Sequence, residues 1–355
     1  MKNIAKILIC YNSHVSIFAI YNGKPADESN VPNDLSESGF SKEINKIKKY
    51  LRENFVEVGS FAVNNNVERT INKLTTYSPD AIFNFVESVD GISSYEYCMA
   101  GLFEMLDIDF TGNTPSCLGN CLNKARAKTI LSSFGINTPA SSVIRIDNDE
   151  LLTKNNFKLK FPVILKLLNE DASIGISELS VVKDLESLNS HIQFLKTTYR
   201  QDILAEEYID GRELNVAVLG DKTLPISEIK FDGLPDGLPK IVTYDGKWIA
   251  DSIYYENTKP SCPAVISPGL KKKVEELALL AFNAMSCRDY ARVDIRLSQE
   301  NVPYVIEVNP NPDISMDSGF ARAAVAAGLN YSDLLFTIAG FALARKGYDT
   351  KIKAG

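Results

Sequence analysis

Apolar and polar residues alternate in two segments near the C-terminal end of the chain, residues 290–297 and 303–309. A strand places successive side chains on opposite faces, so this period of two predicts two strands, each with one face in a core. Residues 298–302 predict a turn that joins the strands as a hairpin. The polar positions of the pattern are Arg292, Asp294, Arg296, Glu307 and Asn309.

Antiparallel pairing of these strands would gather Asp294, Glu307 and Asn309 into one oxygen-rich patch, with Arg292 at its edge. Hard oxygen ligands without His or Cys suit Mg²⁺, which keeps several waters and bridges substrate phosphates. The alternative is an amphipathic sheet whose polar face is simply solvated.

The first third of the chain alternates strand and helix patterns, which is typical of an open α/β unit. Apolar strands are predicted at residues 4–10 and 81–86, and amphipathic helices at 41–55 and 95–106. The segment 22–39 is rich in Pro, Asp, Ser and Asn and predicts a long loop.

Further helices are predicted at 124–134, where Gly135 supplies a C-cap, and at 270–285 and 332–347. The segment 231–263 is rich in Gly, Pro, Tyr and Asp and shows little periodicity. A loop of this length inside a compact protein is usually functional and is often a lid, which is the prediction here.

Strands are predicted at 162–168, 203–209 and 214–219. The first strand carries one lysine among apolar residues, Lys166, which needs an anionic partner if it is half-buried. Asp210-Gly211 between the other two strands is a turn signal.

Composition and charge narrow the class of function. The chain has 355 residues, of which 45% are hydrophobic and 23% charged, so it can bury the cores of two or three domains. A net charge of −7 argues against a nucleic-acid or anionic-membrane partner, and we find no stretch suited to span a membrane. Six cysteines in so long a chain form no disulfide framework, which favours a reducing cytoplasmic location.

The cysteines and histidines give no metal motif. Cys117 and Cys121 lie one helical turn apart, lack a second pair at zinc spacing and are expected in the core. With only His14 and His191, a histidine-based metal or catalytic site is not expected.

Four motifs occur along the chain in an order and at intervals that are unlikely by chance. They are Pro162-Val-Ile-Leu-Lys166, Glu206 to Glu213, Arg292-Val-Asp294, and Glu307-Val-Asn-Pro310. Over nearly its whole length the chain resembles the ATP-grasp superfamily, and within it the D-alanine–D-alanine ligase group. Phe110-Thr-Gly112 followed by Lys124 also matches the ligases.

The resemblance implies an α/β fold of the ATP-grasp type. An open α/β domain would occupy residues 1–116, a central lobe 117–202 and a C-terminal lobe 203–355, with the lid loop at about 231–263. The two α+β lobes would clasp ATP between them.

The resemblance also implies a role for each matching residue, with Arg292 stabilising an acyl-phosphate and the oxyanion formed from it. The ATP-binding residues would be Lys124 and Lys166 at the phosphates, Glu206, Glu207, Tyr208 and Ile209 at adenine, and Glu213 at the ribose. Two Mg²⁺ ions, or Mn²⁺, would be bound by Asp294, Glu307 and Asn309. Catalysis would involve Arg292, Lys247 and Ser173. The substrate contacts would be Glu87, Trp248, Asp313 and Ser318.

Several departures fall where the dipeptide ligases select their substrates. The N-terminal loop, residues 10–16, lacks the family's Gly-rich stretch and glutamate, Ala172-Ser173 replaces a serine pair, and Lys247-Trp248 replaces Lys-Tyr. We therefore expect that the family's link between loop, serine and lid is lost. Asp313 stands near a turn glycine of the family, and its carboxylate would repel an acceptor's carboxylate or bind a cationic or hydroxylated group.

The resemblance implies an ATP- and Mg²⁺-dependent ligase that activates a carboxylate and joins it to an amine, with small-molecule substrates. D-alanyl-D-alanine is not the expected main product. A silent ATP-binding regulatory protein of the same fold is one alternative, although the complete metal set favours catalysis. A small-molecule kinase is another. The family also implies a homodimer formed through the N-terminal domain.

Overall fold

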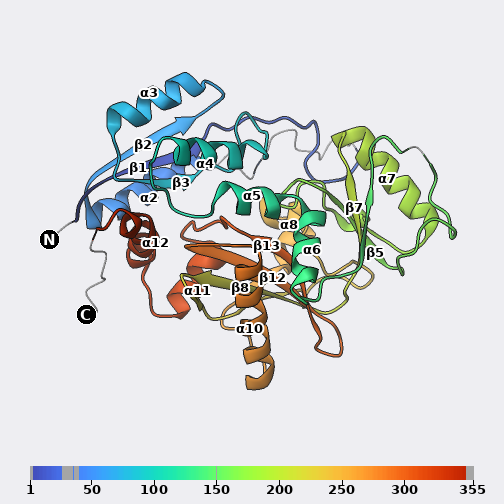
Figure 1. The fold of residues 1–355 in the computed structure, drawn as a ribbon. Helices are drawn as coiled ribbons and strands as arrows, with labels where there is room; N and C mark the ends of the chain where they lie inside the picture. Colours follow the sequence, from blue (N-terminus) through green and yellow to red (C-terminus); the bar gives the residue numbers. More distant parts are fainter. Residues whose placement is uncertain (1–2, 26–34, 36–39, 149, 349–355) are drawn as a thin grey trace.

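The computed structural model describes residues 3–25, 35, 40–148 and 150–348, so most of the predicted loop at 22–39 lies outside the described residues. Within the described part of the chain, the strands form three sheets, each with helices packed against it (Figure 1). This arrangement agrees with the predicted α/β class, with one open unit and two further lobes.

The N-terminal unit is a parallel sheet in the order β2-β1-β3, which needs crossover helices and covered faces. Its strands are β1 (Asn3–Asn12), β2 (Phe55–Val63) and β3 (Ala81–Phe85). The helix α2 (Phe40–Asn54) packs on one face, where it shares a core with α12 (Tyr331–Arg345) from the other end of the chain. The helices α3 (Val67–Tyr77) and α4 (Tyr95–Met105) cover the other face.

The central lobe is an antiparallel sheet in the order β4-β7-β5-β6. The strands are β4 (Ser141–Ile144), β5 (Val163–Leu167), β6 (Val181–Val182) and β7 (Ile203–Glu207), with the 3₁₀ turn η1 (Glu178–Ser180) before β6. The helix α7 (Leu185–Tyr199) packs on it. Two short helices, α5 (Pro115–Leu122) and α6 (Lys124–Ser133), connect the N-terminal unit to this lobe.

The C-terminal lobe is built on a second antiparallel sheet, in the order β11-β10-β8-β12-β13, with β9 paired to β8. Its strands are β8 (Arg212–Leu219), β9 (Lys222–Thr223), β10 (Ser227–Lys230), β11 (Lys259–Ser261), β12 (Tyr290–Leu297) and β13 (Pro303–Asn309). The helix α10 (Pro268–Ala284) packs on its apolar face. The predicted hairpin of β12 and β13 is confirmed, with Asp294 opposite Glu307.

Two expectations about the lobes are wrong in detail. The strands on either side of Asp210-Gly211 belong to different sheets, because β7 pairs within the central sheet and β8 within the C-terminal sheet. The lobe boundary therefore follows β7 rather than preceding it at residue 203. The segment 231–263 is not a plain loop, since it contains α8 (Tyr244–Trp248), α9 (Ile253–Asn257) and β11. Helices of five residues are too short to show a periodic signal.

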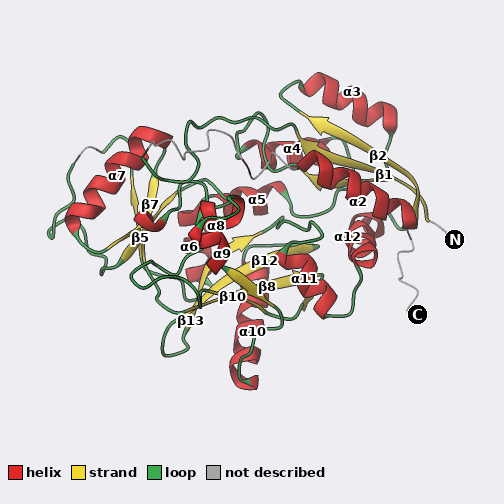
Figure 2. Cartoon of the chain, turned by 180° about the vertical axis from the view of Figure 1, so that it is seen from behind, coloured by secondary structure: helices red, strands yellow, loops and turns green. Residues whose placement is uncertain are grey.

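Figure 2 shows α8 and α9 between the central sheet and the C-terminal sheet. The last two helices, α11 (Gly319–Ala326) and α12, meet at an angle of 104°. Within the described residues, no single helix has the length and apolar character of a membrane span. Only this bent pair, taken as one segment, has that length and composition.

Candidate active site

A cleft of about 1060 Å³ lies between the two lobes, and its lining includes residues 246–248 of α8. Every residue that the sequence predicts for the site lines this cleft. The ATP-binding, metal-binding, catalytic and substrate-contacting sets therefore share one space, although they come from segments more than 200 positions apart.

Glu206 lies at the centre of a buried charge cluster on the central sheet. Lys166 of β5 donates a 3.0 Å hydrogen bond to Oε1 of Glu206, and Nζ of Lys128 lies 2.6 Å from Oε2. Burial alone would raise the pKa of Glu206, but the two lysines outweigh it and lower the pKa. The predicted half-buried Lys166 thus has the anion that it requires.

Sequence reasoning missed Lys128. Its side chain is buried and also donates to the carbonyl oxygen of Pro139, although a lysine inside a helix is ordinarily a surface residue. No local signal distinguishes it, because its partner Glu206 belongs to a strand far along the chain.

The chain crosses between the lobes at residues 207–211, at the predicted adenine end of the cleft. The amides of Glu207 and Tyr208 are held by the carbonyl oxygens of Ala140 and Pro162, at 2.9 Å and 3.0 Å. Arg296 stacks on the ring of Tyr208, and its Nε lies 3.7 Å from Glu213. Burial raises the pKa of Glu213, which lies at the start of β8.

Asp294 is the centre of a hydrogen-bonded cluster on the C-terminal sheet. Arg292 binds both of its carboxylate oxygens, at 2.7 Å and 2.8 Å. The side-chain amides of Asn309 and Asn215 donate to it at 3.0 Å and 2.8 Å. Asn215 was not predicted, but a polar residue between Leu214 and Val216, opposite Asp294 in the register, is a signal that could have found it.

The chemistry of this cluster fits Mg²⁺. The carboxylates of Asp294 and Glu307 and the amide oxygen of Asn309 are hard oxygen donors, and they come from paired positions of β12 and β13. Because Arg292 holds both oxygens of Asp294, a cation that binds there has to take at least one of them from the guanidinium.

Positive side chains converge on Glu307. Lys124 Nζ lies 3.3 Å from its carboxylate. Burial would raise the pKa of Glu307, but Lys124, Lys166, Lys247 and Arg292 together lower it to about 2. This excess of positive charge around one carboxylate is suited to a polyphosphate.

Lys247 projects from α8 into the cleft and stays exposed to the solvent there. The walls of the cleft nevertheless surround it, and this desolvation, together with the nearby Arg292, lowers its pKa. Lys124 shows the opposite result, because Asp171 and Glu307 outweigh its burial and raise its pKa.

The loop at residues 169–175, here called the phosphate loop, is linked to the lid by contacts other than the family's link, whose loss stays a prediction. Trp248 donates from its indole Nε1 to the carbonyl oxygen of Ala172, at 3.1 Å, and Ser173 donates to the carbonyl oxygen of Val242, at 3.0 Å. Both hydrogen bonds are accepted by backbone carbonyl oxygens, whereas the family's link depends on particular side chains. Motif comparison does not detect a contact that depends on backbone atoms.

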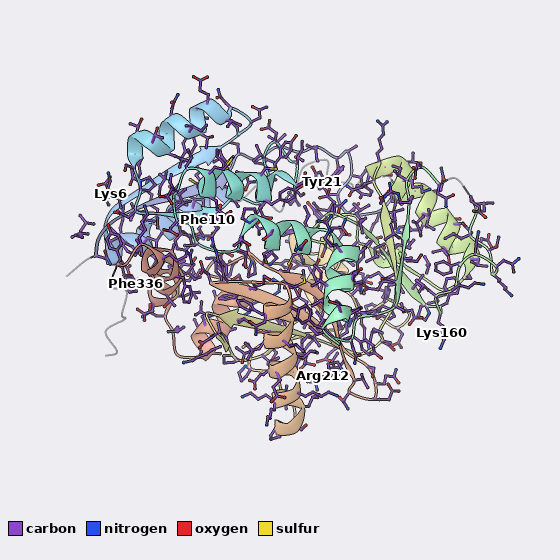
Figure 3. The ribbon with its side chains drawn as sticks, viewed as in Figure 1. Lys6, Tyr21, Phe110, Lys160, Arg212 and Phe336 are labelled. Carbon is purple, nitrogen blue, oxygen red and sulfur yellow. The ribbon has the colours of Figure 1, made fainter. Side chains whose placement is uncertain are left out.

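The segment that contains Tyr21 and Lys24, which follows the N-terminal loop, joins this closure by contacts that the sequence did not predict. Lys24 lies 2.7 Å from Asp245 on the lid and 3.1 Å from Glu178 on the central lobe. The amide of Gly175 donates to the carbonyl oxygen of Tyr21, at 2.8 Å. Figure 3 shows Tyr21 where the N-terminal unit meets the central lobe.

The other predicted substrate contacts, Glu87, Asp313 and Ser318, also line the cleft. Asp313 is exposed, and the backbone amide and hydroxyl of Ser315 hold its two oxygens at 2.8 Å and 2.9 Å. Ser318 caps α11 by accepting from the amide of Ala321, so its hydroxyl oxygen already has a structural role. Glu87 follows β3 and is exposed towards the cleft.

Residues 130–339 match the family model described as the D-ala D-ala ligase C-terminus. The chain is 33% identical over 254 residues to an uncharacterized protein, y4sG, of Sinorhizobium fredii, covering 72% of each chain. It is 30% identical to the D-alanine–D-alanine ligase of Bordetella avium, over 67% of this chain and 71% of that one.

The fold is shared with solved structures. The D-alanine–D-alanine ligase of Bacillus anthracis complexed with ATP superposes with a TM-score of 0.70 at 23% identity. The superposition covers 97% of this chain and 99% of that one.

Proposed function

Since the chain belongs to the D-alanine–D-alanine ligase family of ATP-grasp enzymes, and is therefore an ATP-dependent, ADP-forming carbon–nitrogen ligase, we propose that it joins a carboxylate substrate other than D-alanine to an amine. The first substrate is an amino acid or a related small acid. D-alanyl-D-alanine is not the main product.

One observation carries the difference in substrate. Asp313 presents a carboxylate to the cleft, and Ser315 fixes its orientation through two hydrogen bonds. An acceptor that brings its own carboxylate to this end of the cleft meets a like charge at a fixed position. An amine with a cationic or hydroxylated group there finds a hydrogen-bond acceptor instead.

The chain's residues support acyl-phosphate chemistry. The acid's oxygen attacks the γ-phosphorus of ATP and ADP leaves, after which the amine attacks the acyl carbon and releases phosphate. Lys124 and Lys166 hold the phosphates, while Arg292 and Lys247 stabilise the charge that develops during both steps.

Asp294, Glu307 and Asn309 would hold two Mg²⁺ ions, or Mn²⁺, which neutralise phosphate charge when bound. The contacts of Ser173 and Trp248 keep the lid against the phosphate loop, which excludes water from the reactive acyl-phosphate.

The test of the substrate is release of ADP and phosphate from Mg²⁺-ATP, with amino acids offered singly and in pairs. We expect release in equal amounts that requires a particular pair and that is weak with D-alanine alone. Turnover of D-alanine to its dipeptide at the highest rate in the panel would contradict the proposal. Two variants separate the effect of the Asp313 charge from the effect of its size. Asp313→Gly and Asp313→Asn both remove the charge, and only Asn keeps the size of the side chain.

Asp294→Asn distinguishes the ligase from the two other functions. We expect ATP binding to persist and phosphate release to fall by about 100-fold or more, because groups that stabilise developing charge contribute at this scale. The assays are equilibrium nucleotide binding and phosphate release with the pair identified above. ATP binding by the wild type without phosphate release under any pair would favour a silent binding protein, and ADP without free phosphate would favour a kinase.

A further inference from the structure

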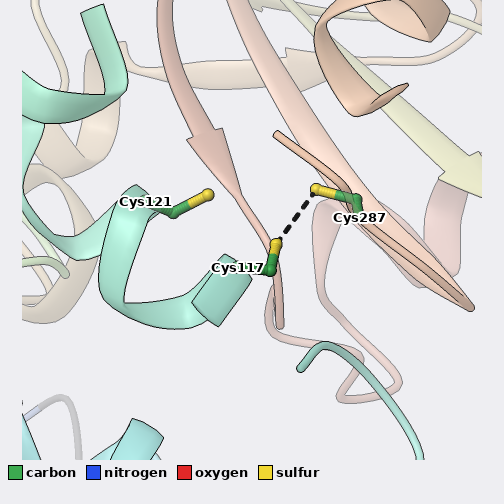
Figure 4. A group of neighbouring side chains, drawn as sticks. All are labelled: Cys117, Cys121 and Cys287. Carbon is green, nitrogen blue, oxygen red and sulfur yellow. Dashed lines mark hydrogen bonds between the residues drawn. The ribbon is translucent and has the colours of Figure 1, made fainter. Parts of the chain in front are cut away.

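Three cysteines from two distant parts of the chain meet next to the cleft (Figure 4). Cys117 and Cys121 lie on α5, and Cys287 lies in the turn between α10 and β12. Their sulfur atoms all lie within 4.8 Å of one another, and the sulfurs of Cys117 and Cys287 are 3.5 Å apart. The sequence predicted only two core residues here, because Cys287 is far from the other two along the chain.

These separations fit a bound metal ion. Thiolates bound to zinc at about 2.3 Å place their sulfur atoms about 3.8–4.0 Å apart in tetrahedral or trigonal geometry. The three sulfurs of this cluster span that value, with 3.5 Å for one pair and 4.8 Å as the upper limit for all. An ion can therefore enter with side-chain adjustments of less than about 1 Å.

The surroundings select a soft ion. Among the described residues, the candidate ligands of this cluster are three cysteine sulfurs and include no carboxylate or imidazole. Thiolates bind zinc and copper(I) in preference to magnesium or calcium. Cys117 and Cys121 are buried in the apolar core that covers the C-terminal sheet. Arg288, next to Cys287, places a positive charge near Cys117 that offsets the charge of the thiolates.

The side chain of Asn113 ties together the two segments that supply the cysteines. The amide oxygen of Asn113 lies 3.5 Å from the sulfur of Cys117 and accepts from the backbone amide of Arg288, at 2.7 Å. Asn113 also donates to the carbonyl oxygen of Tyr290, at 2.9 Å. One fully buried side chain thus connects both segments that supply cysteines.

We propose that Cys117, Cys121 and Cys287 form a trithiolate site for one soft metal ion of the zinc class. Each thiol releases its proton to solvent as the ion binds. The helix α5 leads directly to Lys124, and Cys287 precedes the strand that carries Arg292 and Asp294. The ion would therefore tie together the two elements that supply the phosphate-binding lysine and the metal-binding aspartate.

The test is a titration of the reduced, full-length protein with Co²⁺ in the absence of oxygen, followed by Zn²⁺. We expect one equivalent of Co²⁺ to bind, with a near-ultraviolet thiolate-to-cobalt absorption band that Zn²⁺ abolishes. The band should be lost in Cys117→Ala, Cys121→Ala and Cys287→Ala. It should remain in Cys10→Ala and Cys262→Ala, which remove a buried and a half-buried cysteine outside the cluster.

Circular dichroism of each variant separates loss of the site from loss of the fold. The proposal is overturned if the folded wild type gives no thiolate band with stoichiometric Co²⁺. It is also overturned if the band persists in a folded double variant Cys117→Ala, Cys287→Ala. Neither readout requires ligase activity, so failure here is distinct from failure of the proposed reaction.

Discussion

At the scale of single residues, the buried carboxylate of Glu206 depends on two lysines. Its side chain is 3% exposed, and Lys128 and Lys166 each bind one of its oxygens. Burying a charged group costs free energy unless the group is paired with an opposite charge. Removing one partner of a buried pair is strongly destabilising, because the other charge is left buried without compensation. Lys128 therefore supports the wall of the cleft at Glu206 without lining the cleft itself.

Lys128→Met should lower the free energy of unfolding by about 2 kcal/mol, somewhat less than the usual loss of a buried pair because Lys166 remains. Urea denaturation measures this. The exposed helical pair of Lys272 and Glu276 gives the control, and Lys272→Met should cost less than about 0.5 kcal/mol. Equal losses in the two variants would contradict the buried-pair argument.

At the scale of elements, the lid is held by contacts from two directions. Trp248 and Val242 bind the phosphate loop, and Asp245 pairs with Lys24, which follows the N-terminal loop. Because Lys24 also pairs with Glu178, a single side chain bridges the lid and the central lobe. An N-terminal segment thus takes part in closing a cleft between two later lobes.

Lys24→Met should open the lid more often and speed cleavage of residues 231–263 by a protease, by roughly fivefold for a loss of about 1 kcal/mol. Limited proteolysis followed by mass spectrometry measures the rate at that segment. Lys271→Met, which removes an exposed lysine paired with Glu275, should leave the rate unchanged. Similar rates in the wild type and Lys24→Met would mean that the bridge does not hold the lid.

At the scale of the whole molecule, the two ends of the chain share a core. The helix α12 packs with α2 against the N-terminal sheet, and Tyr290 of β12 joins the same cluster. Figure 1 shows α12 beside the N-terminal strands. The core of the N-terminal unit therefore includes residues from outside 1–116, the range that the sequence predicted for this domain.

Ile338→Ala, in the middle of α12, should destabilise the molecule by about 3 kcal/mol, as expected for a large-to-small change in a core. Because the core includes both ends of the chain, calorimetry should show a single transition that moves to lower temperature. Val325→Ala, at a position that is 63% exposed, should change stability little. Two transitions, of which only one moves, would show that the units unfold independently.

Local pattern was sufficient for the hairpin and for most of the candidate site. A period of two determines which side chains share a face, so Asp294 and Glu307 could be assigned to one polar face from the sequence. Their direct pairing depends on a register shift between Asp294 and Ile295, which the sequence did not predict. The order of four short motifs was likewise enough to place the chain in its family and to collect the residues that line the cleft.

Tertiary structure alone decided the contacts between segments that are remote in sequence. Periodicity reports that Lys128 or Cys287 lies on a given element, but not which other element faces it. The pairing of Lys128 with Glu206, the bridge from Lys24 to Asp245 and the meeting of three cysteines all depend on how separate sheets and helices pack. The same holds for β7 and β8, since a tight turn allows a hairpin or a crossing, and only the available neighbouring strands determine which one forms.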